Sequence, residues 1–278
     1  MNDDGRLAVI FTQGRTWRLD ELPPRSIALD GAVRGPAYDN VARRYSFDHH
    51  EGVIRHATRA TCEQVCEALL VGFDPSGYRV YLNDLDGDTA LSLWLLLHPE
   101  RLRGRGGARV RALVDRVGRV DALGPGRGRP HPIHVLLSPP PGARQTRDDI
   151  DRALALIDRW WTTGKLPRAP RATPVDAFWV DRGGTLRHGC VDRMVGLYRV
   201  ADVGVLHGPA AFGTRAYTIA KRSEFIDYDI TAFLAAMNAL EAGWGGGSTV
   251  GGAPRHADGR RSSLALDAVA AQFRAGVG

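Results

Sequence analysis

Three adjacent residues near the start of the chain, Asp48, His49 and His50, combine a carboxylate with two imidazoles. Carboxylate oxygens and imidazole nitrogens are ligands for divalent ions such as Mg²⁺, Mn²⁺ and Zn²⁺. An imidazole beside an acid can also donate a proton. Few structural roles need these three side chains together, so the tripeptide indicates a metal site with acid–base chemistry.

Further acids follow apolar stretches that are expected to be strands, namely Asp30, Asp84, Asp86 and Asp88. Open α/β sheets bind ligands at the carboxyl ends of their strands, so these acids are expected to gather near the tripeptide. Carboxylates that share one sheet edge repel one another unless a cation lies among them. A Mn²⁺, Mg²⁺ or Zn²⁺ centre explains the set, while helix capping explains Asp86 and Asp88 equally well.

A second candidate site is the glycine-rich segment of residues 243–255. Glycines let backbone N–H groups approach an anion closely, and hydroxyl and guanidinium groups add donors. The expected phosphate contacts are Gly246, Gly247, Ser248, Thr249 and Arg255. No Gly-Lys-Ser/Thr follows, which excludes a P-loop, and a flexible loop is the alternative interpretation.

The elements that position these residues alternate between strands and helices in the first half of the chain. Strands are expected at residues 7–12, 26–29, 45–47 and 78–82, and helices at residues 60–71, 89–97 and 148–161. This alternation predicts an α/β fold with a mostly parallel sheet. Later in the chain, strands are expected at residues 177–180, 194–200 and 216–220, and helices at residues 230–242 and 262–273.

A chain of 278 residues can form two ordinary domains. Residues 165–174 hold three prolines and no apolar periodicity, which is typical of a linker. We therefore expect a first domain at residues 1–164, with a connecting helix, and a second at residues 175–278.

Charge and cysteine content narrow the class of protein. The formal net charge is +6 and nearly all of the cations are Arg, which suits a phosphorylated or polyanionic partner, although a GC-rich coding genome is the simpler explanation. Three cysteines are too few for a disulfide framework and favour a cytoplasmic location. No apolar run approaches the roughly 20 residues that span a bilayer, so no membrane association is expected. The oligomeric state is not readable, and a homodimer is compatible with the sequence.

The segment from Tyr45 to His50, with Asp30 before it and Asp84 after it, resembles the DHH phosphoesterase superfamily. The segment of residues 243–255 is similar to the glycine-rich substrate loop of that superfamily's second, DHHA1-type domain. The resemblance implies a DHH-type α/β domain, a smaller α+β domain of the DHHA1 type, and an active site in the cleft between them.

The same resemblance implies one or two ions of Mn²⁺ or Mg²⁺ and a small phosphorylated substrate. It implies that Asp30, His49 and Asp84 are metal ligands. It places His50, beside Asp48, near the scissile phosphate as a catalytic group.

Residues 12–21 run parallel to the first metal motif of one branch of the superfamily, but Gln13 and Arg18 stand where that motif has histidines. Arg keeps its proton and cannot bind a metal ion. Three alternatives stay open. Asp20 and Glu21 hold an ion without an imidazole, or the centre holds a single ion, or Arg18 replaces an ion as the catalytic cation that binds phosphate.

The expected function is that of a metal-dependent phosphoesterase that hydrolyses a small nucleotide-like or short oligonucleotide phosphoester. The alternative is a DHH-like protein that binds a phosphorylated ligand without hydrolysing it, or uses the altered site for another reaction. A third hypothesis, a nucleic-acid-binding module, rests on the Arg-rich residues 101–129.

Overall fold

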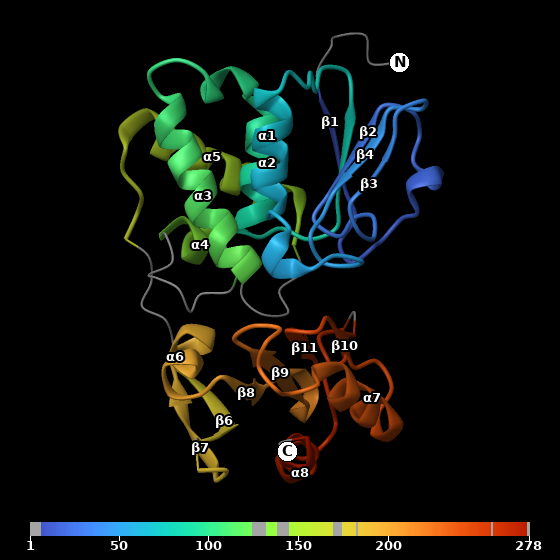
Figure 1. Ribbon diagram of the computed structural model, residues 1–278, viewed down its shortest axis with the longest axis vertical. Coiled ribbons are helices and arrows are strands. Elements are labelled where there is room, and N and C mark those ends of the chain that lie inside the picture. Colours follow the sequence, from blue (N-terminus) through green and yellow to red (C-terminus); the bar gives the residue numbers. More distant parts are fainter. Residues whose placement is uncertain are drawn as a thin grey trace. The chain divides into compact units, whose positions relative to one another are not determined.

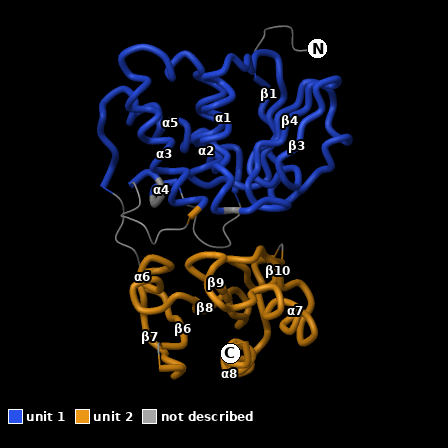
Figure 2. The backbone as a smooth tube through the Cα atoms, viewed as in Figure 1, with its two compact units in different colours: residues 1–122, 128–170 blue, residues 123–127, 171–278 orange. Residues whose placement is uncertain are grey.

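The computed structural model describes residues 7–123, 132–137, 145–168, 174–181, 183–256 and 258–276. The chain forms two compact units (Figure 1, Figure 2). One comprises residues 1–122 and 128–170, and the other comprises residues 123–127 and 171–278. Each unit has its own hydrophobic core and is described by itself.

The first unit is built on a five-stranded sheet with the order β1-β5-β2-β4-β3. Its strands are β1 (Ala8–Phe11), β2 (Ser26–Leu29), β3 (Ala37–Asp39), β4 (Arg44–Phe47) and β5 (Arg79–Leu82). Strands β1, β5, β2 and β4 pair in parallel, and β3 pairs with β4 in the antiparallel direction. The prediction of an α/β fold with a mostly parallel sheet is therefore confirmed, although β3 was not predicted.

The helices of this unit pack against one face of the sheet (Figure 1), and they are α1 (Thr61–Leu70), α2 (Gly87–Leu97), α3 (Gly107–Leu123), α4 (Pro132–Leu137) and α5 (Arg147–Thr163). Because side chains alternate along a strand, Ile27 and Leu29 of β2 face these helices, whereas Ala28 packs against Trp17 and Leu22 on the other face. Among the described residues, no helix has the length and apolar content that a membrane span needs.

Two apolar features of this unit have clear positions. Cys62 and Cys66 are buried on α1 as core residues, as their helical spacing predicts. Trp160 and Trp161 on α5 both join the core of the first unit, where the ring centroid of Trp161 lies 6.2 Å from that of Trp94.

The second unit contains an antiparallel sheet with the order β10-β11-β9-β8-β6-β7. Its strands are β6 (Val175–Val180), β7 (Leu186–Val191), β8 (Val203–Pro209), β9 (Arg215–Lys221), β10 (Gly245–Gly246) and β11 (Val250–Gly252). Its helices are α6 (Arg193–Val200), α7 (Ile230–Leu240) and α8 (Leu266–Ala275). The strand predicted at residues 194–200 is wrong, because Met194, Leu197 and Tyr198 recur at helical spacing and pack α6 against a small core.

Candidate metal centre

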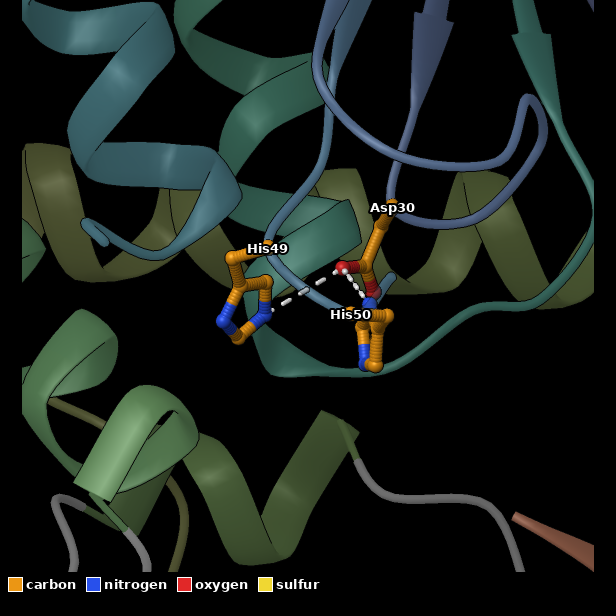
Figure 3. Close-up of side chains that lie close together, drawn as sticks. All are labelled: Asp30, His49 and His50. Atoms are coloured by element: carbon orange, nitrogen blue, oxygen red, sulfur yellow. Dashed lines mark ion pairs between the residues drawn. The ribbon is translucent and has the colours of Figure 1, made fainter. Parts of the chain in front are cut away.

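The carboxyl ends of neighbouring parallel strands bring three of the predicted residues together (Figure 3). Asp30 follows β2, and His49 and His50 follow β4, the strand beside it. Asp30 has a left-handed backbone with φ 50°, and its carboxylate oxygens accept hydrogen bonds from the hydroxyls of Thr61 (3.0 Å) and Thr89 (2.9 Å). These bonds hold the carboxylate in a position that faces both imidazoles.

His49 is fully buried, and its Nε2 atom faces three carboxylates. Nε2 lies 2.7 Å from Asp121 Oδ2, 3.6 Å from Asp30 Oδ1 and 3.9 Å from Asp88 Oδ2. Nδ1 of His49 is buried without a hydrogen-bond partner among the described residues, and Nε2 makes ion-pair contacts with these carboxylates. Burying an imidazole in this way is costly, and a bound cation would take the place of a proton on one of its nitrogens. An imidazole surrounded by carboxylates therefore fits a divalent ion.

Two overlapping groups of side chains could hold such an ion. One group joins Asp30, His49 and His50, and the other joins His49, Asp88 and Asp121. Both groups share His49, and carboxylates of both approach the same Nε2 atom. One nitrogen cannot bind two ions at once, so an ion bound to Nε2 can belong to only one of the two groups at a time.

Asp86 and Asp88 both act as helix caps. Asp86 accepts a hydrogen bond from the backbone N–H of Thr89 at 2.9 Å and caps α2. Asp88 accepts hydrogen bonds from the backbone N–H groups of Thr61 and Cys62, both at 2.8 Å, at the start of α1. Helix capping and metal binding were the two interpretations of this residue. Asp88 fits both, because it caps a helix and also belongs to a candidate metal group.

Burial and charge shift the pKa values of this cluster in different directions. Burial opposes the charged form of His49, but the close carboxylates of Asp121 and Asp30 raise the pKa of His49 to about 10. Burial, with the charges of Asp30 and Asp121, raises the pKa of Asp86 to about 8. Asp30 is also buried, yet the imidazoles lower its pKa to about 2. Neighbouring carboxylates repel one another, so some of them stay protonated. A cation bound among them could take the place of those protons.

Asp48 and His50 form a separate pair beside this cluster. Asp48 is buried and accepts a hydrogen bond from the backbone N–H of Gly35 at 2.7 Å. Its Oδ1 atom lies 2.8 Å from Nδ1 of His50, whose side chain is 44% exposed. Burial opposes ionisation of Asp48, but the contacts with His50 and Gly35 lower its pKa. Asp48 therefore orients His50, which presents its ring to solvent.

The other predicted metal ligands do not join either group. Asp84 is exposed, and its carboxylate accepts a hydrogen bond from the next backbone N–H at 2.9 Å. Asp20 is exposed and forms an ion pair with Arg18 at 2.7 Å. Gln13 accepts a hydrogen bond from the backbone N–H of Gln145 at 3.0 Å. Among the described residues, the candidate groups contain neither Asp20 nor Asp84.

A cavity of about 610 Å³ lies elsewhere in the first unit. The charged side chains in its lining include Arg18, Asp20, Asp39 and Arg44. These four residues form two ion pairs with each other, so their charges are balanced. The cavity lining contains none of the residues of the metal centre.

The glycine-rich segment forms the hairpin of β10 and β11 rather than an open loop. Gly246 pairs with Gly251, and the N–H of Gly247 donates to the carbonyl of Val250 at 2.8 Å. A Cβ atom at Gly252 would lie 2.5 Å from the backbone oxygen of Tyr217. At least part of this glycine content is thus required by close strand packing.

The predicted phosphate contacts are spread along this hairpin. Ser248 and Thr249 lie in its turn, between β10 and β11. Arg255 lies beyond the other end of β11, three residues after Gly252. Ser248 and Thr249 therefore lie at the opposite end of β11 from Arg255.

The Arg-rich region of residues 101–129 extends into residues 124–129, which lie outside the described residues. In its described part, Arg101 contacts the Asp158 carboxylate. Arg109 donates to the carbonyl of Trp160 at 2.8 Å and lies over its ring. These arginines take part in packing within the first unit.

Asp121 is the functional candidate that the sequence analysis missed. It lies in the last turn of α3, 72 residues after His49 in the sequence. The carboxyl end of a helix disfavours negative charge. An acid in the last turn of a helix is therefore unusual, and this position could have marked Asp121 as a candidate.

Comparison of the chain with protein-family models, with curated proteins and with solved structures found no match. The similarity to the DHH superfamily therefore rests on the motifs alone. The chemistry of the site must be judged from its own geometry.

Proposed function

We propose that this protein is a metal-dependent phosphoesterase that acts on a small nucleotide-like or short oligonucleotide substrate. The observation that carries the proposal is the buried His49 imidazole, whose Nε2 atom faces Asp30, Asp88 and Asp121. The motif resemblance to DHH phosphoesterases supports the same reaction class. Mn²⁺ or Mg²⁺ is the proposed ion, held by these four side chains.

An ion bound there would supply Lewis-acid activation of water and would neutralise charge on the phosphoryl group. His50 is the proposed proton donor to the leaving oxygen, because its ring is exposed beside the cluster. Asp48 keeps that ring oriented through the 2.8 Å contact with Nδ1. Asp48 is itself held by the backbone N–H of Gly35.

The test is release of product from a dinucleotide in the presence of Mn²⁺, with the variants His49→Ala and Asp30→Ala. Loss of the ion should reduce turnover by at least about 100-fold, since metal catalysis contributes several kcal/mol. Asp115→Asn is the matched control, because Asp115 is an exposed acid on α3 paired only with Arg119 among the described residues. Turnover by His49→Ala equal to that of the control would rule out the proposal.

Arg18, which lines the cavity of about 610 Å³, favours a second candidate function, a phosphate-binding protein without hydrolytic activity. An arginine at the position of a metal-binding histidine repels a cation, and it binds phosphate well. Measured metal content separates the two functions. Less than one ion per chain, with nucleotide binding but no turnover, would favour this second candidate.

A further inference from the structure

Two arginines, Arg255 and Arg261, flank a tight turn in the second unit. The N–H of His256 donates to the carbonyl of Arg260 at 3.1 Å, and the N–H of Gly259 donates to the carbonyl of His256 at 3.0 Å. The hydrogen bond between residues 256 and 260 brings the backbone of the flanking residues, Arg255 and Arg261, close together, and the positive charge of Arg255 acts on Arg261. Like charges that lie near each other repel.

One donor of the Arg261 side chain has no acceptor among the described residues. It is half-buried, and its Nε atom is buried without a hydrogen-bond partner among the described residues. Burial, and then the charge of Arg255, lower the pKa of Arg261. A guanidinium nevertheless keeps its proton at any relevant pH, so Arg261 stays charged and its Nε–H has no acceptor among the described residues.

Nearby acids are engaged elsewhere. Asp258 in the turn pairs with Arg260 at 2.6 Å. Glu241 accepts hydrogen bonds from the backbone N–H of Ser263 at 2.7 Å and from Trp244 Nε1 at 3.1 Å. No described carboxylate therefore neutralises the two arginines.

Three other cations of this unit have partners within the fold. Arg187 pairs with Asp181 at 2.7 Å, and Arg222 pairs with Asp202 at 3.0 Å. Lys221 is buried, but its Nζ donates to backbone carbonyls, including that of Tyr228 at 2.9 Å. These side chains are satisfied within the fold, so they offer less to an external anion.

We propose that Arg255 and Arg261 form an anion clamp that binds the phosphate group of a phosphorylated ligand. A phosphate would offset the repulsion between the guanidinium groups and accept hydrogen bonds from them. That this ligand is the substrate rests on the proposed function, whereas phosphate binding itself does not. The proposal centres the phosphate contacts of the second unit on this turn rather than on the hairpin tip at Ser248 and Thr249.

The test is a calorimetric titration of the full chain with inorganic phosphate, with adenosine monophosphate and with adenosine. Arg261→Gln and Arg255→Gln should each weaken binding of phosphate and of the nucleotide by at least about tenfold, the effect of losing a charge-assisted hydrogen bond. Arg260→Gln is the matched control, since Arg260 is the neighbouring arginine that already has a carboxylate partner, and it should bind within about twofold of the wild type. Unchanged phosphate affinity in Arg261→Gln, or an equal loss in Arg260→Gln, would overturn the clamp.

Folding of the variants is checked by thermal unfolding. Because Arg255 is exposed and repels Arg261, Arg255→Gln should keep the melting temperature of the wild type in phosphate-free buffer. Added phosphate should then raise the melting temperature of the wild type but not that of the variant. An equal rise in both would contradict the clamp.

The arms of the experiment separate two sources of the anion. Tighter binding of the monophosphate than of inorganic phosphate identifies a phosphorylated ligand, whereas equal affinities identify free phosphate as the ligand and overturn that part of the proposal.

The metal centre is tested independently by His49→Ala. If His49→Ala abolishes turnover but keeps phosphate affinity, both proposals stand. If the protein has no turnover but Arg261→Gln loses phosphate, only the proposed function fails.

Discussion

At the scale of single residues, the candidate metal centre depends on one imidazole and the acids around it. His49 is buried with its Nε2 atom close to carboxylates from β2, from α2 and from α3. Of these acids, Asp121 comes closest, at 2.7 Å. A ligand set of this kind binds an ion only while each acid keeps its position. Asp121 is the acid farthest from His49 in the sequence, so replacing Asp121 is the sharpest test of the site.

Replacing Asp121 by Asn should weaken Mn²⁺ binding by at least about tenfold, because even indirect partners of a metal site contribute 10–100-fold to affinity. The measurement is a metal titration of the full chain followed by calorimetry. Asp115→Asn, on the exposed side of the same helix, should bind Mn²⁺ like the wild type. Equal affinities of the two variants would remove Asp121 from the site.

At the scale of elements, the hairpin of β10 and β11 shows how local composition can suggest a function that packing explains. Its glycines pair across the hairpin and approach β9 and α7 closely. A Cβ atom at Gly252 would meet backbone at 2.5 Å, whereas one at Gly247 would meet nothing within 4 Å. The two positions therefore separate a packing role from an anion-binding role.

Gly252→Ala should lower the free energy of unfolding by about 1–3 kcal/mol, as overpacking does when the neighbouring backbone has to move. Gly247→Ala should change it by less than about 0.5 kcal/mol. Chemical denaturation measures both values. A loss of phosphate affinity in Gly247→Ala would return the binding role to the hairpin turn.

At the scale of the whole molecule, the two proposed sites belong to different units. All residues of the candidate metal centre lie within residues 1–122, and the arginines of the anion clamp lie within residues 171–278. Each unit has its own buried core, around Trp94 in the first and around Phe178 in the second. A unit that has its own hydrophobic core can in principle fold without the rest of the chain.

A fragment of residues 1–170 should therefore unfold cooperatively and bind Mn²⁺ with an affinity within about threefold of the full chain, because no proposed metal ligand lies outside it. Thermal unfolding and metal titration of the fragment measure this. A fragment without a cooperative transition would show that the first core needs the rest of the chain.

Much of the secondary structure could be predicted from periodicity. The stretches of residues 26–29 and 230–242 closely match β2 and α7, because their apolar residues recur with a clear local pattern. The edge strand β3 was missed, since it has three residues and Tyr38 on it is 75% exposed. The segment of residues 194–200 was assigned to the wrong element, because its short apolar pattern is ambiguous and its helical packing is a tertiary feature.

By itself, the sequence determined that Asp48, His49 and His50 follow one strand and that Asp30 follows another, because adjacent residues and strand ends are local properties. Only the tertiary structure decided that Asp88 and Asp121 also reach His49, since α2 and α3 must pack against the sheet first. The approach of the backbone of Arg255 to that of Arg261 likewise depends on a turn. A pattern in sequence cannot show such meetings, because they depend on the packing of elements that share no local periodicity.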